Sequence, residues 1–201
     1  MLKKKLIALL FAILLAVTMA SAHKEILITK DLSAVYFIVG KYLISHNEFS
    51  NAIPYFKKTI ELRPDFAEAY HNLGISYYYS GDAKKAIDFL AESVEIKKDY
   101  AKGHYTLALI YYEQKDFDNA ISHLSTVTQL EPDNANAHFD LAVAYADRFK
   151  KKESSGDIIL GDLEDLREAL KHYIKADELK PGFSHSSSNA KIIERVISEY
   201  E

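Results

Sequence analysis

The chain has 201 residues, of which 48% are hydrophobic and 27% charged, and its formal net charge at pH 7 is -4. A chain of this length forms one or two domains, and its slight acidity supplies no basic field of the kind that attracts nucleic acid. It contains no cysteine, which excludes disulfides, thiolate metal sites and a cysteine nucleophile.

The N-terminal segment has the pattern of a secretory signal peptide. Three lysines at 3–5 are followed by an unbroken apolar run over 6–17 and by the small-residue cleavage pattern Ala20-Ser21-Ala22. The apolar run is shorter than the roughly 20 residues that span a bilayer. We therefore expect residues 1–22 to be cleaved; an uncleaved membrane anchor and a cytoplasmic helix are the alternatives. Residues 23–32 are a short linker.

From residue 33 onward the sequence repeats with a period of 34 residues. Ala52, Ala86 and Ala120 lie 34 apart, each followed by isoleucine, and Gly40 and Gly74 keep the same step. A fixed period of this length indicates a stack of equivalent structural units. The predicted units are 33–66, 67–100, 101–134 and 135–183, and a capping helix follows over 184–201.

Each unit contains two amphipathic helical patterns joined by a short turn. In the second unit, apolar residues recur at helical spacing over 70–77 and again over 86–96, on either side of Gly81-Asp82. An aspartate precedes each later first helix and is expected to cap it with its carboxylate. These aspartates are Asp65, Asp99 and Asp133.

The units resemble tetratricopeptide repeats (TPR), whose pattern is an aromatic, then Leu-Gly, Tyr, Ala, Phe and Pro. The first unit supplies Tyr36, Val39-Gly40, Leu43, Ala52, Phe56 and Pro64, and the second supplies Tyr70, Leu73-Gly74, Tyr77, Ala86 and Leu90. The resemblance covers residues 33–183. It implies an all-α fold: a right-handed superhelical solenoid of four TPR helix pairs plus a C-terminal capping helix, nine helices in all.

The fourth unit departs from the period by an insertion at about 149–163. Tyr145 and Ala169 lie 24 residues apart, whereas their counterparts in the third unit lie nine apart. Insertions in repeat proteins map to loops, often near the binding face. This insertion, which contains Lys150-Lys151-Lys152 and Ile158-Ile159-Leu160, is either a lip that contacts a partner or a tolerated surface loop.

The resemblance also implies a concave groove lined by the first helix of each unit. The groove positions are Phe37, Lys41, Ile44, His71, Ile75, Tyr78, Tyr79, Tyr105, Leu109, Tyr112, Phe139, Val143 and Asp147. Family members that hold a terminal carboxylate use Lys, Asn and Arg here, and only Lys41 remains. An apolar, aromatic lining suits an apolar peptide segment or a helix. Three further tyrosines are expected in the core: Tyr77, Tyr111 and Tyr145.

The histidines invite a metal hypothesis, but packing explains them better. His104 and His138 take the place of an aromatic in the repeat. The sequence contains no HExxH pattern, phosphate-binding loop or nucleophile motif. We therefore expect no catalytic residue, no metal site and no cofactor. The carboxylates of Glu164-Asp165 are assigned to the start of a helix.

The expected function is that of an exported scaffold, periplasmic or extracellular, which binds a protein or peptide partner in its groove within an envelope or extracellular assembly. No nucleic-acid partner is expected, and membrane contact would come only through an uncleaved N-terminal segment. One alternative is a glycan or small-ligand binding protein that uses the tyrosines. A further alternative is an enzyme with its site in the inserted loop.

Overall fold

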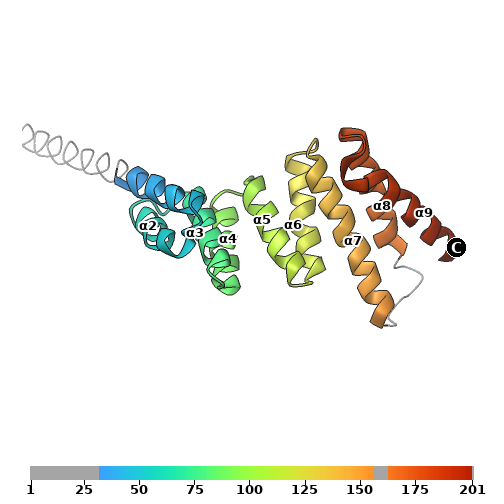
Figure 1. Ribbon diagram of the computed structural model, residues 1–201, viewed down its shortest axis with the longest axis horizontal. Helices are drawn as coiled ribbons and strands as arrows, with labels where there is room; N and C mark the ends of the chain where they lie inside the picture. The colour runs from blue at the N-terminus through green and yellow to red at the C-terminus, as the bar shows by residue number, and fades with distance from the viewer. Residues whose placement is uncertain (1–31, 156–162, 201) are drawn as a thin grey trace, which may run out of the picture. The chain divides into compact units, whose positions relative to one another are not determined.

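The computed structural model describes residues 32–155 and 163–200, and all regular structure within these ranges is helical (Figure 1). The elements are a helix over 32–45, α2 (Phe49–Leu62), α3 (Ala67–Tyr79), α4 (Ala83–Ile96), α5 (Ala101–Glu113), α6 (Phe117–Leu130), α7 (Ala135–Ser155), α8 (Leu163–Leu179), the short 3-10 helix η2 (Phe183–His185) and α9 (Ser186–Tyr200). The predicted all-α class is confirmed. The predicted signal peptide and Ile158-Ile159-Leu160 lie outside the described residues.

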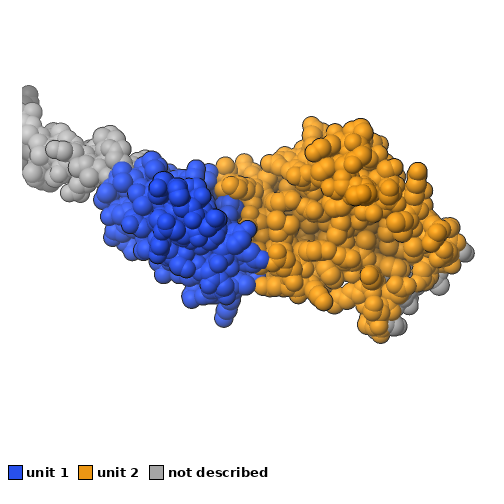
Figure 2. All heavy atoms as spheres, in the orientation of Figure 1, with its two compact units in different colours: residues 1–89 blue, residues 90–201 orange. Residues whose placement is uncertain are grey.

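The chain divides into two compact units, 1–89 and 90–201, with the boundary inside α4 (Figure 2). In unit 1, α2 packs against α3. In unit 2, the helices from α5 to α9 pack in chain order, each against the next. Consecutive helices that pack on one another are what a repeat of helix pairs requires, because each pair buries its apolar face only on its neighbours.

The 34-residue period is visible in the helices and in the core. The helices α3, α5 and α7 begin at Ala67, Ala101 and Ala135. The leucines at the equivalent position of three first helices are at most 1% exposed: Leu73, Leu107 and Leu141. The alanines of the second helices are fully buried: Ala52, Ala86, Ala120 and Ala169. Of the tyrosines predicted in the core, Tyr77 is buried, whereas Tyr111 and Tyr145 are only half-buried.

The small residues allow close helix approach. A Cβ atom added at Gly40 would lie 2.7 Å from two ring carbons of Phe56, which is fully buried. Atoms this close overlap, so any larger residue at this position forces the ring to move.

The helix starts differ from the prediction at the caps. The three aspartates predicted as caps do not fill this role, and the residues directly before α3, α5 and α7 are Phe66, Tyr100 and Asn134. The first two form no side-chain cap, while Asn134 Oδ1 accepts a hydrogen bond from a backbone amide of α7. Asp65, Asp99 and Asp133 lie one residue too early. The carboxylates that do cap helices belong to Asp82 and Asp116, in the turns before α4 and α6.

A residue with positive φ forms the turn between the two helices of each of the first three repeats. Asn47, Gly81 and Lys115 have φ of 61°, 89° and 59° and lie one period apart. The next position in this series is Phe149, which is helical and 4% exposed. A bulky aromatic is disfavoured at positive φ, and burial of its ring keeps α7 helical as far as Ser155. The first part of the predicted insertion is therefore an extension of α7 and not a loop.

The capping helix contacts this extension. The ring of Tyr200, at the end of α9, packs edge-on against Phe149 with 5.9 Å between centroids. Its hydroxyl donates a hydrogen bond of 2.7 Å to Glu153 Oε1. Phe149 also belongs to the core cluster that includes Ala190 and Ile193 of α9. The longer α7 thus gives the final helix additional surface to pack against.

Candidate functional site

In unit 1, several of the predicted groove residues contact one another or a neighbouring helix. Phe37 is half-buried, with ring centroids 4.6 Å from Phe66, and the Lys41 ammonium lies 5.7 Å from the Phe37 centroid. Tyr79 is 63% exposed and stacks on Phe49 of α2 at 4.5 Å. The other positions, Ile44, Ile75 and Tyr78, are half-buried.

The prediction that His71 lines an open groove is wrong, because this side chain is 0% exposed. Ala69, Leu73 and Ser76 of the same helix are also fully buried, and these positions are spread around α3. A side chain without exposed surface, such as that of His71, does not line a groove.

In unit 2, two tyrosine–aspartate hydrogen bonds join α5 to α7. Tyr105 Oη donates to Asp140 Oδ2 at 2.5 Å, and Tyr112 Oη donates to Asp147 Oδ2. Both bonds span 35 residues of sequence, one more than the repeat. The two tyrosines are seven residues apart, as are the two aspartates, so the bonds lie about 10.5 Å apart along the helices. We call these two bonds the tyrosine–aspartate rungs.

A small hollow opens between the rungs. Its volume is about 100 Å³, and it is lined by Ala108, Leu109, Tyr112, Leu124, Asp140 and Val143. Leu109 is 40% exposed, and Val143 is half-buried. The predicted groove residues Leu109, Tyr112 and Val143 therefore line one hollow, and Tyr105 donates its hydrogen bond to Asp140 at the edge of that hollow. Phe139 packs to one side, against Tyr173 and Phe183 at 5.6 and 5.7 Å.

The surroundings of the rungs keep both tyrosine hydroxyl groups protonated, so that they donate hydrogen bonds. Burial, together with the hydrogen bond to an aspartate, raises the pKa of Tyr105 and of Tyr112 well above the usual value for tyrosine. Burial also raises the pKa of Asp140, while its hydrogen bond from Tyr105 opposes this shift. Each aspartate uses one oxygen for its tyrosine, and a carboxylate can accept several hydrogen bonds.

Sequence reasoning missed Asp140. The signal was present in the sequence, because the step from Tyr105 to Asp140 equals the step from Tyr112 to Asp147. This equal spacing becomes informative only once the structure shows that hydrogen bonds join α5 to α7.

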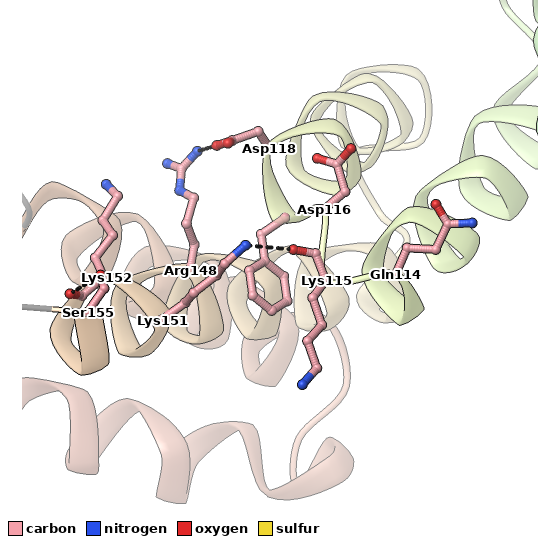
Figure 3. Close-up of a pocket in the computed structure, with 9 residues that line it drawn as sticks. Gln114, Lys115, Asp116, Asp118, Arg148, Lys151, Lys152 and Ser155 are labelled. Atoms are coloured by element: carbon pink, nitrogen blue, oxygen red, sulfur yellow. Dashed lines mark hydrogen bonds and ion pairs between the residues drawn. The ribbon is translucent and has the colours of Figure 1, made fainter. Parts of the chain in front are cut away.

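A second, larger hollow lies where the extended part of α7 passes the turn after α5 (Figure 3). Its volume is about 470 Å³. It is lined by Gln114, Lys115, Asp116, Phe117, Asp118, Arg148, Lys151, Lys152 and Ser155. Three of these residues, Lys151, Lys152 and Ser155, belong to the predicted insertion, so the insertion borders a hollow of its own, separate from the one between the rungs.

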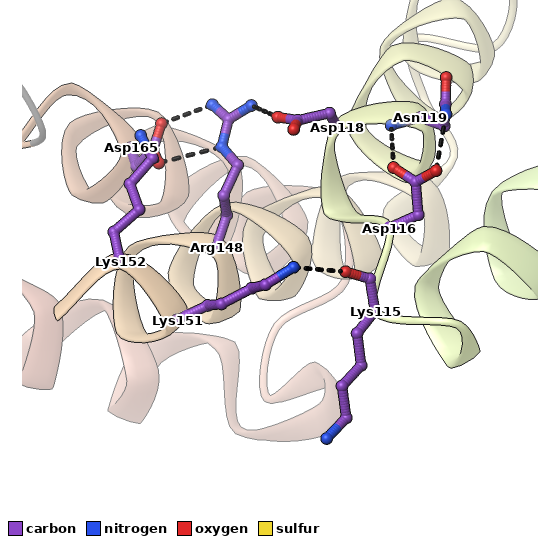
Figure 4. A network of polar contacts seen from close by, with 8 residues as sticks. All are labelled: Lys115, Asp116, Asp118, Asn119, Arg148, Lys151, Lys152 and Asp165. Atoms are coloured by element: carbon purple, nitrogen blue, oxygen red, sulfur yellow. Dashed lines mark hydrogen bonds and ion pairs between the residues drawn. The ribbon is translucent and has the colours of Figure 1, made fainter. Parts of the chain in front are cut away.

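The charged side chains at this hollow tie three helices together (Figure 4). Arg148 of α7 donates to both carboxylate oxygens of Asp165, at 3.0 and 2.5 Å, and to Asp118 of α6 at 2.6 Å. Lys152 donates to Asp165 at 3.2 Å, and Lys151 donates to a backbone oxygen at the α5–α6 turn at 3.2 Å. The carboxylate of Asp165 is only 7% exposed and lies in the first turn of α8. This network anchors the α7 extension.

Within 32–155 and 163–200, no three or more acidic or histidine side chains form a group that could hold a metal ion. Across the same residues, no helix combines the length and the apolarity needed to cross a membrane.

Comparisons with known proteins agree with the fold. The family model described as TPR repeat matches residues 108–147, and the model for anaphase-promoting complex, cyclosome, subunit 3 matches residues 45–127. Both matches support a protein built of tetratricopeptide repeats. No curated protein matches the sequence.

Solved structures of low sequence identity share the fold. A crystal structure of MamA protein superposes with a TM-score of 0.64 at 22% identity, over 85% of this chain and 88% of that chain. Pseudomonas aeruginosa pilF gives 0.65 at 16% identity, over 86% and 72%. The first TPR of Spaghetti (RPAP3), solved with the HSP90 peptide SRMEEVD, gives 0.52 at 20% identity, over 66% and 93%. The fold is thus that of tetratricopeptide-repeat proteins, a class of scaffolds for protein–protein interaction.

Proposed function

We propose that this protein is a non-catalytic interaction module that binds a segment of a protein partner between α5 and α7 of unit 2. The observation that carries the proposal is the pair of tyrosine–aspartate rungs with an apolar hollow between them. A half-exposed leucine beside half-buried tyrosines offers contact area at a low entropic cost, since tyrosine has few rotatable bonds.

The rungs also define the chemistry of the partner. Asp140 and Asp147 each present a carboxylate, so the partner should carry hydrogen-bond donors with positive charge. Their separation is about 10.5 Å. In an extended chain the side chains alternate between two faces, so residues i, i+2 and i+4 share one face, and i and i+4 lie roughly 13 Å apart. An extended segment with basic residues at i and i+4 and an apolar residue at i+2 therefore presents all three side chains to the hollow, and long lysine side chains cover the small difference in spacing between the carboxylates.

A fluorescein-labelled peptide containing Lys-Gly-Leu-Gly-Lys between glycine-serine flanks tests this proposal by fluorescence anisotropy with the purified chain. Asp147→Asn removes one charged acceptor at the groove, and we expect it to weaken binding about 10-fold, because a hydrogen bond to a charged group contributes about 1.5–3 kcal/mol. Asp88→Asn is the matched control: it removes the same charge from an exposed carboxylate of unit 1 and should leave binding unchanged.

Two results would contradict the proposal. One is that neither Asp140→Asn nor Asp147→Asn changes the affinity for the peptide. The other is equal binding of a peptide with Glu-Gly-Leu-Gly-Glu at the same positions. Thermal stabilisation by a panel of oligosaccharides, without binding of either peptide, would favour the glycan-binding alternative.

We also propose that the protein is exported and serves in an envelope or extracellular assembly. The support is the charged start, apolar run and small-residue cleavage pattern of residues 1–22. Cell fractionation followed by N-terminal sequencing tests this: we expect the mature chain to begin at His23, and an intact Met1 in a soluble cell extract would refute export.

A further inference from the structure

Two histidine pairs occupy equivalent places in the third and fourth helix pairs. Nδ1 of His104 in α5 lies 2.9 Å from Nδ1 of His123 in α6. Nδ1 of His138 in α7 lies 2.8 Å from Nδ1 of His172 in α8. In both pairs, Nε2 of the first histidine lies near a backbone carbonyl of the preceding turn, at 3.2 and 3.1 Å. The same geometry thus appears twice, one repeat apart.

These contacts determine how many protons a pair can hold. A carbonyl oxygen only accepts, so the first histidine, His104 or His138, must carry hydrogen on Nε2. When this ring is neutral its Nδ1 is an acceptor, and the partner ring donates Nδ1–H to it. When it is charged, it donates from both nitrogens and the partner accepts. When both rings are charged, both Nδ1 atoms carry hydrogen and lie less than 3 Å apart, so two donors of like charge face each other without an acceptor. Each pair therefore accommodates one added proton and not two.

The surroundings of the third-repeat pair favour neutral rings. The ring of Tyr111 stacks on His123 at 5.7 Å between centroids. Burial, and next the charge of His104, lower the pKa of His123 to about 4.

The fourth-repeat pair has more charged neighbours. Tyr145 stacks on His172 at 6.3 Å, and Glu168 Oε2 lies 3.7 Å from His172 Nε2. Burial lowers the pKa of His172 to about 4; His138 and Lys171 add to this shift and Glu168 opposes it. Burial also lowers the pKa of His138, and Lys175 acts in the same direction.

The direction of the pH dependence follows from these pKa values. In the unfolded chain histidine binds a proton near pH 6.5, whereas His123 and His172 in the folded chain bind one only near pH 4. Between these values the unfolded state holds more protons, so the folded state loses stability as the pH falls from about 6.5 towards 4. Above about pH 6.5 the full stability is present.

Unit 1 contains a natural comparison. One and two periods before His104, the sequence has Tyr70 and Tyr36, and the places that match His123 hold Phe89 and Tyr55. The rings of Tyr36 and Tyr55 pack with centroids 6.4 Å apart. Phenol and phenyl rings gain no charge in this pH range. The acid-sensitive pairs therefore belong to unit 2 alone among the four equivalent places.

We propose that the two histidine pairs make unit 2 an acid-labile element: a second proton on either pair separates its two helices. Because Tyr105 and Phe139 directly follow the first histidines of the two pairs, this opening also disturbs the face between α5 and α7. Release of a bound partner on acidification would follow, and that consequence alone rests on the function proposed above.

Thermal unfolding and hydrogen–deuterium exchange of the full chain at pH 8 and pH 5 test the proposal. His123 and His172 each have a pKa of about 4 in the folded chain and about 6.5 in the unfolded chain. Between pH 8 and pH 5, each of them therefore lowers the ratio of folded to unfolded protein by at most about 30-fold. After correction for the intrinsic exchange rates, we expect peptides of α5–α8 to lose protection at pH 5.

The decisive variant replaces each pair with the residues of the second repeat: His104→Tyr with His123→Phe, and His138→Tyr with His172→Phe. We expect the melting temperature of this variant to depend much less on pH than that of the parent chain. An unchanged pH dependence in this variant, or unchanged protection of α5–α8 in the parent chain at pH 5, would overturn the proposal. The parent chain provides a test that needs no variant: NMR titration of the imidazole C–H signals, in which values at or above 6.5 for His123 and His172 would also overturn it.

Discussion

Replacing Asp165 with alanine should destabilise unit 2 by about 2–3 kcal/mol. Breaking a buried ion pair costs about 3–5 kcal/mol, because the remaining charge is buried without compensation. Here Arg148 loses two hydrogen bonds but keeps Asp118, and its side chain is 23% exposed, so water reaches it and lowers the cost. Urea unfolding at pH 7, followed by circular dichroism at 222 nm, measures this difference in the free energy of unfolding.

Two control variants separate the buried pair from other effects of charge. Asp118→Ala removes the other carboxylate bound to the same arginine, but that carboxylate is 82% exposed, so we expect at most about 1 kcal/mol. Glu164→Ala removes a neighbouring charge from the first turn of α8 and measures the interaction with the helix dipole, about 0.3–1 kcal/mol. A loss below about 0.5 kcal/mol for Asp165→Ala, or an equal loss for Asp118→Ala, would refute the assignment of Asp165 as the anchor of the α7 extension.

Three further substitutions test the packing of the helix pairs by the same unfolding measurement. Gly40→Ala should lower the free energy of unfolding by about 0–2 kcal/mol, because overpacking against Phe56 costs about 1–3 kcal/mol and the higher helix propensity of alanine returns about 1 kcal/mol. In a Phe56→Leu background most of the overpacking cost should disappear. If the effects of the two substitutions simply add, the contact between them is refuted. Tyr77→Ala should cost about 3–5 kcal/mol because this buried ring stacks on Phe89, and a cost below 1 would contradict its place in the core. Tyr200→Phe should cost no more than about 1 kcal/mol, since its hydrogen bond to Glu153 is exposed, and a larger loss would mean that the end of α9 depends on that bond.

The insertion shows where sequence reasoning was partly successful. Its position was found by counting residues between Tyr145 and Ala169, but its conformation could not be found by counting. The period places Phe149 where earlier repeats turn with positive φ. Whether that residue turns or continues the helix depends on what its ring can pack against, and Tyr200 at the far end of the chain supplies part of that contact.

The helix caps show a smaller failure of the same kind. Asp65, Asp99 and Asp133 are good capping residues by type, but a cap must be the residue directly before the first helical turn. The helices begin two residues after these aspartates, so the cap position falls on an aromatic residue in two cases and on Asn134 in the third. A shift of one residue in a helix start is enough to remove the cap.

The sequence by itself determined the helix pairs, their period and the leucines and alanines of the core. It could do so because each helix pair is built from neighbours in sequence, and the buried face of a helix follows from spacing of three and four residues. The tertiary structure decided what each residue at an equivalent position of the repeats contacts. His71, Tyr105 and Phe139 hold the same place in three repeats, yet one is fully buried, one donates a hydrogen bond to Asp140 and one packs beside Tyr173. Burial depends on what covers a face, and those neighbours come from distant parts of the chain.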